Sequence, residues 1–369
     1  MKFRIYTSYE LFKAIRFIIN FKGTHIFFFP RYAMGGAEKV HLDIVKLNKR
    51  KPLVIFTSPS HNEFHKQEFL NFAYCIEISE ILKFPLLKWT LSCILKVKIN
   101  KCKVVFGCNS KYFYELIAKI NSKSVQIIDL FHAFHEHRKK GILFWSQFVQ
   151  NKVNQRIVIN NIVKTNLTEY YSLNKITNFP KIKVIDNYVE FPNKKREKSS
   201  QIKIVYLGRF CTKLKNTQYV FNIAKNLIKD RKFEFHFAGF VRSDAKDHEI
   251  PENCTIHGLL ETSAVYDLLL QSDLLIITSK LEGFPVVIME AMICGVVPIT
   301  TNVGGIPSHV NETNGFIVSY NPDMINQFTN ILKRIGKSQL ASMSKNGINY
   351  AEQNFAKEKF IKNYMDILY

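Results

Sequence analysis

Short apolar runs alternate with longer amphipathic stretches along most of this chain. Runs of four to six residues, at 26–29, 104–107, 203–207, 233–238 and 274–277, are typical of strands buried in a parallel sheet. The stretches between them carry apolar residues at helical spacing, for example at 40–47, 112–120, 163–171 and 219–228. Strand and helix therefore alternate in two series, which predicts an α/β protein with two Rossmann-like domains.

The two series are separated by a change in composition. Residues 191–200, FPNKKREKSS, are mostly polar or charged and include a proline, which predicts a linker. We expect an N-terminal domain over 1–190, a C-terminal domain over 201–350, and a last helical segment over 351–369 that could pack back on the first domain. Residues 1–22 predict a helical extension that precedes the first strand.

The most informative stretch is 279–295, SKLEGFPVVIMEAMICG. Pro285 suits the first turn of a helix, where its missing N–H has no helical partner anyway, and Gly295 suits the C-terminal end of that helix. The backbone N–H groups near Phe284 and up to Val287 should then lie at the carboxyl end of the sheet, where an anion is favoured.

A further strand is predicted at 296–301. The sequence Gly304-Gly305-Ile306-Pro307 after it predicts a turn that leads into another helix.

Two carboxylates stand on either side of the predicted helix start. Glu282 lies in the loop before the helix, and Glu290 lies about a turn and a half inside it. A nucleotide sugar needs acceptors for the hydroxyls of its sugar and its ribose, with donors for the diphosphate between them. The order of groups along this stretch therefore suits such a ligand.

These residues carry a resemblance. The pattern E-G-F-P-x4-E-A-x3-G-x2-P, from Glu282 to Pro298, resembles the donor-site signature of retaining glycosyltransferases of the GT-B type, the large family numbered four, also called glycosyl transferases group 1. Gly35-Gly36-Ala37-Glu38, between a predicted strand and a predicted helix, resembles the opening loop of the same family. The resemblance implies a GT-B fold, with two Rossmann-like domains facing a central cleft.

The resemblance also implies how the donor binds. Glu290 would bind ribose hydroxyls, and Glu282 would hold the hydroxyls of the transferred sugar. The remaining donor-binding residues would surround the sugar and the diphosphate with backbone groups; they are Gly35, Gly36, Gly208, Gly283, Phe284, Pro285, Val286 and Val287.

Four residues are implied in catalysis: Glu282, Arg209, Lys215 and His132. Gly208-Arg209 with a following lysine resembles the family's pair of cations for the leaving diphosphate, and Lys213 competes with Lys215 for that role. The chain contains no D-x-D motif, which agrees with transfer that needs no metal. His132 follows a predicted strand, where the family often places an active-site histidine; His135 and His137 compete with it.

The charge balance points to an anionic partner. The chain has 52 Lys and Arg against 30 Asp and Glu, a net charge of +22. Residues 81–101 place Trp89 and other apolar side chains among lysines, including Lys83, Lys88, Lys96 and Lys98. This pattern is typical of an interfacial membrane helix, although a helix that covers the sheet with a solvated lysine face would show it equally.

Other features limit the location. No run of about 18 apolar residues and no signal peptide are present, so we expect a cytoplasmic protein that is peripheral at the anionic inner face of the membrane. The seven cysteines form no C-x-x-C pair, which favours reduced thiols over disulfides or a zinc site.

The sequence therefore predicts a retaining, metal-independent glycosyltransferase of the hexosyltransferase type. It would move a sugar from a UDP- or GDP-linked donor to a glycan or lipid-linked glycan, in synthesis of a bacterial capsule, O-antigen or exopolysaccharide. No cofactor, no metal and no nucleic-acid partner are expected. Two alternatives stay open: a GT-B nucleotide-sugar epimerase, and a basic binding protein without enzymatic activity.

Overall fold

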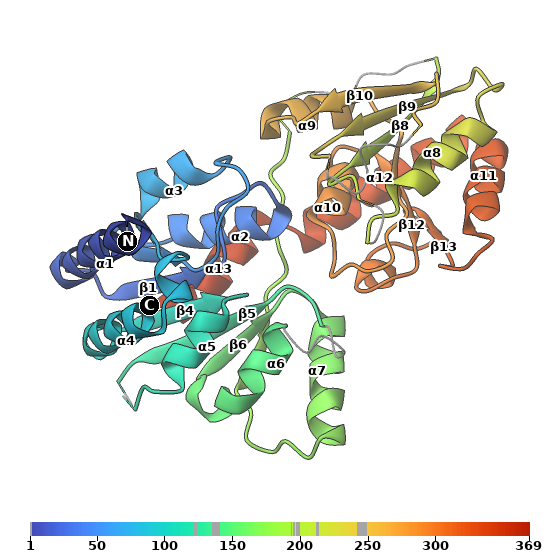
Figure 1. Cartoon of the computed structure of the whole chain (residues 1–369). Helices are drawn as coiled ribbons and strands as arrows, with labels where there is room; N and C mark the ends of the chain where they lie inside the picture. Colours follow the sequence, from blue (N-terminus) through green and yellow to red (C-terminus); the bar gives the residue numbers. More distant parts are fainter. Residues whose placement is uncertain are drawn as a thin grey trace. The chain divides into compact units, whose positions relative to one another are not determined.

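The structure is a computed structural model that describes residues 2–121, 124–134, 141–192, 194, 196, 200–211, 214–241 and 249–369. The chain divides into two compact units. The first comprises Met1–Ile185 together with Ile361–Tyr369, and the second comprises Asp186–Phe360. Each unit has a parallel sheet with helices between its strands (Figure 1), so the predicted α/β class is confirmed.

The described residues of the first unit form a seven-stranded sheet in the order β3-β2-β1-β4-β5-β6-β7. Its strands are β1 (His25–Phe29), β2 (Leu53–Phe56), β3 (Tyr74–Glu77), β4 (Val104–Cys108), β5 (Gln126–Phe131), β6 (Gln155–Val158) and β7 (Lys181–Val184). Every neighbouring pair is parallel. All residues of β1, β2 and β4 are buried, which explains their nearly continuous apolar sequence.

The helices of the first unit connect these strands or precede them. They are α1 (Lys2–Asn20), α2 (Gly36–Lys46), α3 (Lys66–Phe72), α4 (Pro85–Ile99), α5 (Lys111–Ile117), α6 (Ile142–Ser146) and α7 (Asn161–Leu173), with 3-10 turns at η1 (Ile81–Lys83) and η2 (Gln147–Lys152). The predicted helical extension before the first strand is confirmed as α1.

The described residues of the second unit form a six-stranded parallel sheet in the order β10-β9-β8-β11-β12-β13. Its strands are β8 (Ile202–Leu207), β9 (Phe233–Ala238), β10 (Cys254–Gly258), β11 (Leu274–Ile277), β12 (Val297–Thr301) and β13 (Phe316–Val318). Its helices are α8 (Thr217–Asn226), α9 (Thr262–Leu270), α10 (Val286–Ile293), α11 (Met324–Arg334) and α12 (Lys337–Asn354), with a 3-10 turn at η4 (Ile306–Ser308).

The last helix, α13 (Lys357–Leu368), begins in the second unit and ends in the first. Its end is held in the first unit by two hydrogen bonds. His25 Nε2 lies 2.9 Å from the carbonyl oxygen of Leu368, and the backbone N–H of Lys49 donates to the Tyr369 hydroxyl at 2.8 Å. The terminal residues therefore complete the first unit.

Both sheets contain a point where the strand order reverses. In the first unit it lies between β1 and β4, and in the second it lies between β8 and β11. The loops that leave two neighbouring strands in opposite directions open a crevice at such a point, so ligands of doubly wound sheets bind there, outside the carboxyl ends of the strands. The conspicuous loops of the sequence, at Gly35, Gly208 and Glu282, all follow strands that flank these two points.

Several local predictions were wrong. The loop Gly304-Gly305-Ile306-Pro307 leads only into the three-residue turn η4, not into a helix. Pro285 is the N-cap of α10, with an extended ψ of 128°, and the helix begins at Val286 rather than at the proline. Residues 81–101 are not one helix, because α4 begins at Pro85 after the separate turn η1.

One ion pair is buried completely in the first unit. The Arg156 guanidinium donates to both carboxylate oxygens of Asp129, Nε to Oδ1 at 2.9 Å and Nη2 to Oδ2 at 2.6 Å, and both side chains have 0% exposure. The Tyr114 hydroxyl adds a hydrogen bond to Asp129 at 3.1 Å, and Arg156 also donates to Gln150 at 3.0 Å and to the Tyr171 hydroxyl. This network joins β5, β6 and α7 under the carboxyl end of the sheet.

We expect Asp129→Ala to destabilise the first unit by about 3–5 kcal/mol, because it leaves the Arg156 charge buried without its partner. Urea unfolding followed by circular dichroism measures this loss. Glu249→Ala is the matched control, since it breaks an ion pair with Lys225 whose side chains are 61% and 80% exposed. An equal loss of stability in the two variants would contradict a buried, uncompensated Arg156 as the cause, because an exposed ion pair contributes little.

Candidate functional site

In the second unit, the loop after β8 is joined to the loop after β11. The Lys280 N–H donates to the Leu214 carbonyl oxygen at 2.8 Å. The Thr278 hydroxyl donates to the Lys215 carbonyl oxygen at 3.0 Å. The Asn216 side chain donates back to the Thr278 carbonyl oxygen at 3.1 Å. Because β8 and β11 flank the reversal of strand order, these bonds close the loops together where a ligand is expected.

Lys215 and Glu282 form an ion pair within this pair of loops. The Lys215 Nζ lies 2.5 Å from Glu282 Oε1, and the side chains are 22% and 11% exposed. The neighbouring Asn216 holds a left-handed backbone (φ 49°) as the N-cap of α8, which ends the loop immediately after Lys215. The structure therefore brings together two of the predicted catalytic residues; the competing Lys213 lies outside the described residues.

A second glycine loop packs directly against the Glu282 backbone. Gly304 has a left-handed φ of 55°, and a Cβ placed on it would lie 1.8 Å from the Glu282 carbonyl oxygen. The next residue, Gly305, donates its N–H to the carbonyl oxygen of Gly283 at 2.5 Å. The Gly-Gly pair of this motif is thus needed for close approach to the Glu282–Gly283 loop, which the sequence had suggested only as a helix start.

The other predicted carboxylate, Glu290, is placed differently from Glu282. It is the fifth residue of α10 and is 7% exposed. Burial raises the pKa of the Tyr266 hydroxyl, and the negative charge of Glu290 raises it further, which places this carboxylate close to a residue of α9. Glu282 thus lies on the side of the β8 loop, whereas Glu290 lies on the side of α9.

The residues between the two carboxylates form the beginning of α10. Gly283 is half-buried, as are Pro285 and the first two helical residues, Val286 and Val287. Phe284 is buried and stacks on the His309 ring with centroids 4.1 Å apart. Burial among these rings lowers the pKa of His309 to about 4, so the stacked imidazole is uncharged near neutral pH. An uncharged aromatic wall therefore fixes the start of α10.

Arg209 lies in the same β8 loop, but its side chain is exposed, unlike that of Lys215. The preceding Gly208 is in close contact with Gly239. A Cβ placed on Gly239 would lie 1.8 Å from the Gly208 carbonyl oxygen. Close contact between these two glycines sets the path of the loop as it leaves β8. The arginine is consequently presented to solvent at the carboxyl end of the sheet.

In the first unit, the predicted Gly-Gly loop lies at the start of α2. Gly35 is the N-cap and Gly36, which is exposed, is the first helical residue. Just before them, the Met34 N–H donates to the Asn62 side chain at 2.9 Å. Asn62, in the loop after β2, also accepts the N–H of Phe64 at 3.2 Å. The sequence analysis did not single out Asn62, because only the folded chain brings the loop after β2 against the loop after β1.

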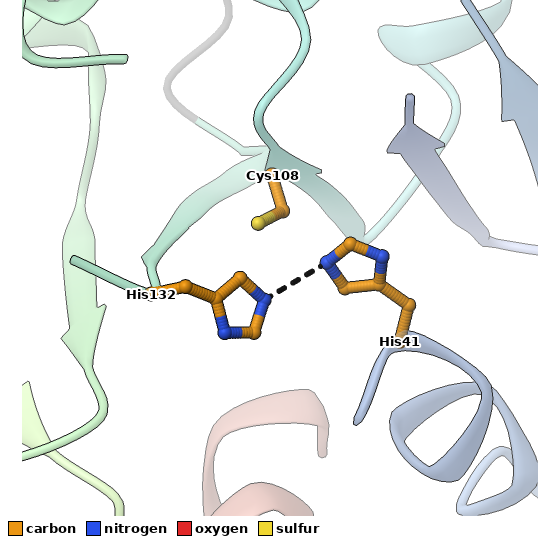
Figure 2. A group of neighbouring side chains, drawn as sticks. All are labelled: His41, Cys108 and His132. Atoms are coloured by element: carbon orange, nitrogen blue, oxygen red, sulfur yellow. Dashed lines mark hydrogen bonds between the residues drawn. The ribbon is translucent and has the colours of Figure 1, made fainter. Parts of the chain in front are cut away.

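His132 directly follows β5 and lies against a second histidine. Its Nε2 is 3.1 Å from Nε2 of His41, a buried residue of α2, and Cys108 at the end of β4 points toward both rings (Figure 2). Burial lowers the pKa of His132 to about 4 and that of His41 well below its usual value. Neither His41 nor Cys108 belongs to a motif that marks it in the sequence; the competing His135 and His137 lie outside the described residues.

The fold is that of the GT-B glycosyltransferases, since two doubly wound parallel α/β sheets match solved structures of that class. One match is the Anabaena protein Alr3699/HepE in complex with UDP and glucose. It has a TM-score of 0.75 and 16% identity, over 94% of this chain and 99% of that one.

A match to a known family lies within the second unit. Residues 188–353 match the family described as glycosyl transferases group 1. The loops at Gly208, Lys215, Glu282 and Gly304 all lie inside the matched region.

Two curated relatives match over longer stretches. An uncharacterized 41.2 kDa protein in the cps region of Klebsiella pneumoniae is 24% identical over 54% of this chain and 59% of its own length. The N-acetyl-alpha-D-glucosaminyl L-malate synthase of Bacillus anthracis is 27% identical over 60% of this chain and 53% of its own. The chain thus spans between half and three fifths of the relatives it matches.

Gly304→Ala should destabilise the second unit by more than the strain of a left-handed alanine, because its Cβ would also overlap the Glu282 loop. Any residue with a Cβ in the left-handed region costs about 1–2 kcal/mol, and Gly304 adds the overlap with the Glu282 carbonyl oxygen. Gly258→Ala is the matched control, because Gly258 has a φ of 71° in the same unit but open space around its Cβ. The unfolding temperature should therefore fall further for Gly304→Ala than for Gly258→Ala. Equal decreases would contradict the close approach of Gly304 to the Glu282 loop.

Proposed function

We propose that the chain is a retaining glycosyltransferase of family four. It transfers a hexose from a UDP- or GDP-linked donor to a glycan or lipid-linked glycan acceptor, without a metal. The observation that carries this proposal is the Lys215–Glu282 pair at the reversal of strand order in the group 1 domain.

The ion pair suits a site that waits for an anion. With both side chains only partly exposed, each charge compensates the other in the absence of donor. When a diphosphate enters, Lys215 exchanges the Glu282 carboxylate for phosphate oxygens, and Glu282 becomes available for the hydroxyls of the sugar. The same ion pair therefore prepares Lys215 to bind the diphosphate and Glu282 to bind the sugar.

The charges near this loop can stabilise the departing nucleoside diphosphate. Negative charge grows on the bridging oxygen as the sugar leaves, and fixed cations at that position lower the barrier. Lys215 supplies one such cation, and the exposed Arg209, in the same loop, supplies the second. The start of α10 adds backbone N–H groups, and Glu290 binds the ribose.

The two relatives support different parts of the proposal. The Klebsiella relative is a protein of a cps region, which favours a role in a bacterial surface polysaccharide. The Bacillus relative is named for the synthesis of an N-acetylglucosaminyl compound, which favours transfer of a sugar. The structural match to a protein in complex with UDP and glucose favours a UDP-linked hexose as donor. We therefore propose a step in the assembly of a surface polysaccharide, with Gly35 and Gly36 near the donor and His132 near the transferred sugar.

We further propose that the first unit works at the anionic surface of the inner membrane leaflet. Leu86, Trp89 and Val97 are 71%, 61% and 62% exposed and lie at helical spacing along one face of α4. On α1, which packs against α4, exposed Tyr9, Phe12 and Ile19 also lie at helical spacing. Apolar groups that project among basic ones match an interfacial surface rather than a solvated helix face.

The lysines of η1 and α4 contribute less to the attraction of an anionic surface than their number suggests. Lys88 pairs with Glu115, Lys83 with Glu80 at 2.5 Å, and Lys98 donates to the Phe21 carbonyl oxygen. The net charge of +22 over the whole chain still attracts an anionic surface. No helix in the described part of the chain is long and apolar enough to cross a bilayer.

The donor assignment is tested by binding and turnover of nucleotide sugars. We expect Glu290→Ala to weaken binding of the UDP- or GDP-sugar by about 30- to 1000-fold, since a charged hydrogen bond of ~2–4 kcal/mol is lost. Glu282→Ala should lower turnover by a similar factor yet preserve donor binding, because Lys215 is then released for phosphate. Calorimetry with a panel of nucleotide sugars measures binding, and product formation measures turnover.

Glu312→Ala is the control for both measurements, because Glu312 is an exposed glutamate of the same unit outside these loops. It should behave like the unchanged protein. Near-normal binding by Glu290→Ala, together with near-normal turnover by Glu282→Ala, would rule out this donor site.

The membrane assignment is tested with vesicles rich in anionic phospholipid. We expect the protein to bind them at low salt and to be released at high salt, as screening shortens the Debye length. Replacing Leu86, Trp89 and Val97 together by serine should abolish sedimentation with vesicles while leaving donor binding unchanged. Leu173→Ser is the control, since Leu173 is 81% exposed on α7 of the same unit; release by this change, or no binding by the unchanged protein, would contradict the proposal.

A further inference from the structure

Two histidines and a cysteine from three separate elements converge at the carboxyl end of the first sheet. His41 comes from α2, Cys108 ends β4, and His132 directly follows β5. Their potential ligand atoms all lie within 4.8 Å of one another, and the two Nε2 atoms are 3.1 Å apart. Figure 2 shows the three side chains pointing toward one another.

The strand register explains this convergence. Cys108 of β4 is paired with Leu130 of β5, so the two side chains emerge on the same face of the sheet. His132 is two residues beyond Leu130 and returns to that face. His41 lies on the helix that leaves β1, the neighbour of β4 on its other side. The cluster is therefore placed by the sheet itself rather than by flexible loops.

The His41 ring is held in a buried position by two contacts. It lies parallel to the ring of Phe29, with centroids 4.2 Å apart and planes inclined by 4°. Its Nε2 is hydrogen-bonded to the Nε2 of His132 at 3.1 Å, whereas its Nδ1 has no hydrogen-bond partner among the described residues. The stacking and the hydrogen bond therefore aim the His41 Nε2 at the point that His132 and Cys108 also approach.

We propose that His41, Cys108 and His132 bind one Zn²⁺ ion. Two imidazole nitrogens and a thiolate form a ligand set that zinc prefers, whereas Mg²⁺ and Ca²⁺ require oxygen ligands. In tetrahedral coordination the ligand atoms are roughly 3.3–3.6 Å apart, from zinc–nitrogen and zinc–sulfur distances of about 2.0–2.3 Å. The imidazole nitrogens thus need to separate by a few tenths of an ångström, and the sulfur, which lies within 4.8 Å of them, needs to approach by up to roughly 1 Å.

The burial of the three residues leaves one coordination position available. His41 and Cys108 are fully buried, whereas His132 is half-buried at the end of its strand. A zinc ion held from the inner side by three protein ligands keeps its fourth position for water or a small ligand on the His132 side. The Cys108 thiol must lose its proton when zinc binds, so binding of the ion is expected to weaken as the pH falls.

This site shares His132 with the proposed function, which places that residue near the transferred sugar, whereas Lys215 and Glu282 are not among the zinc ligands. Zinc bound at the His132 Nε2 would therefore inhibit transfer. Binding of the ion itself does not depend on the proposed function, so the test below uses a spectroscopic readout.

Cobalt is a spectroscopic substitute for zinc and reports directly on thiolate ligation. The full chain, stripped with EDTA and kept reduced, is titrated with Co²⁺. We expect one equivalent to bind, with a thiolate-to-cobalt charge-transfer band in the near-ultraviolet and visible bands typical of four-coordination, and we expect Zn²⁺ to abolish these bands. Cys108→Ser should remove the charge-transfer band and weaken metal binding by at least about 10-fold.

Cys102→Ser is the matched control, because Cys102 is also a buried thiol of the first unit but lies outside the cluster. It should keep the cobalt spectrum. His132→Gln, a change at the half-buried position, is a second variant with an intact thiol, and it should weaken binding while circular dichroism stays unchanged.

The proposal is overturned if the unchanged protein gives no charge-transfer band, or if Cys108→Ser keeps it. Transfer activity is compared in the stripped and the zinc-loaded protein as a separate measurement. Activity that is lost on stripping and restored by metal would refute metal-free transfer while leaving the zinc site intact, so failure of the two proposals can be distinguished.

Discussion

The hydrogen bonds between the loops after β8 and β11 are the constraint on which the second unit's site depends. Lys280 and Thr278 bind the backbone of the loop that carries Lys215, and the Asn216 side chain closes the same contact from the other side. These bonds use backbone groups that would otherwise be unpaired beyond the strand ends. Because they hold two loops that leave the sheet in opposite directions, Lys215 and Glu282 meet at the reversal of strand order, and Gly304 then packs against the result.

The two units use the same topology for different local chemistry. At the reversal point of the second sheet, a lysine and a carboxylate form an ion pair that is partly exposed. At that of the first, the groups are neutral imidazoles and a thiol in an apolar setting, and burial lowers the pKa of both imidazoles. The carboxyl ends of parallel strands lie at one edge of the sheet, so side chains that are distant in the sequence come together there.

Neither assembly requires a flexible scaffold. The Asp129–Arg156 pair and its tyrosine partners lock β5, β6 and α7 beneath the His132 position, and the stack of Phe284 on His309 fixes the start of α10. The buried polar network is costly to break, because removing one member leaves its charged partner buried without compensation.

The sequence alone determined the α/β class and most strands, because apolar periodicity is a local property of the chain. It also marked the Glu282, Glu290 and Gly35 stretches as candidates, through the order of residues that carries the family resemblance. It could not determine that Gly304 and Gly305 serve close packing rather than a helix start, since only folding brings them onto the Glu282 loop. It also could not pair Lys215 with Glu282, 67 positions apart, or place His41 against His132, 91 positions apart. Those partners are chosen by strand order and register, which depend on how the whole sheet packs rather than on any one segment.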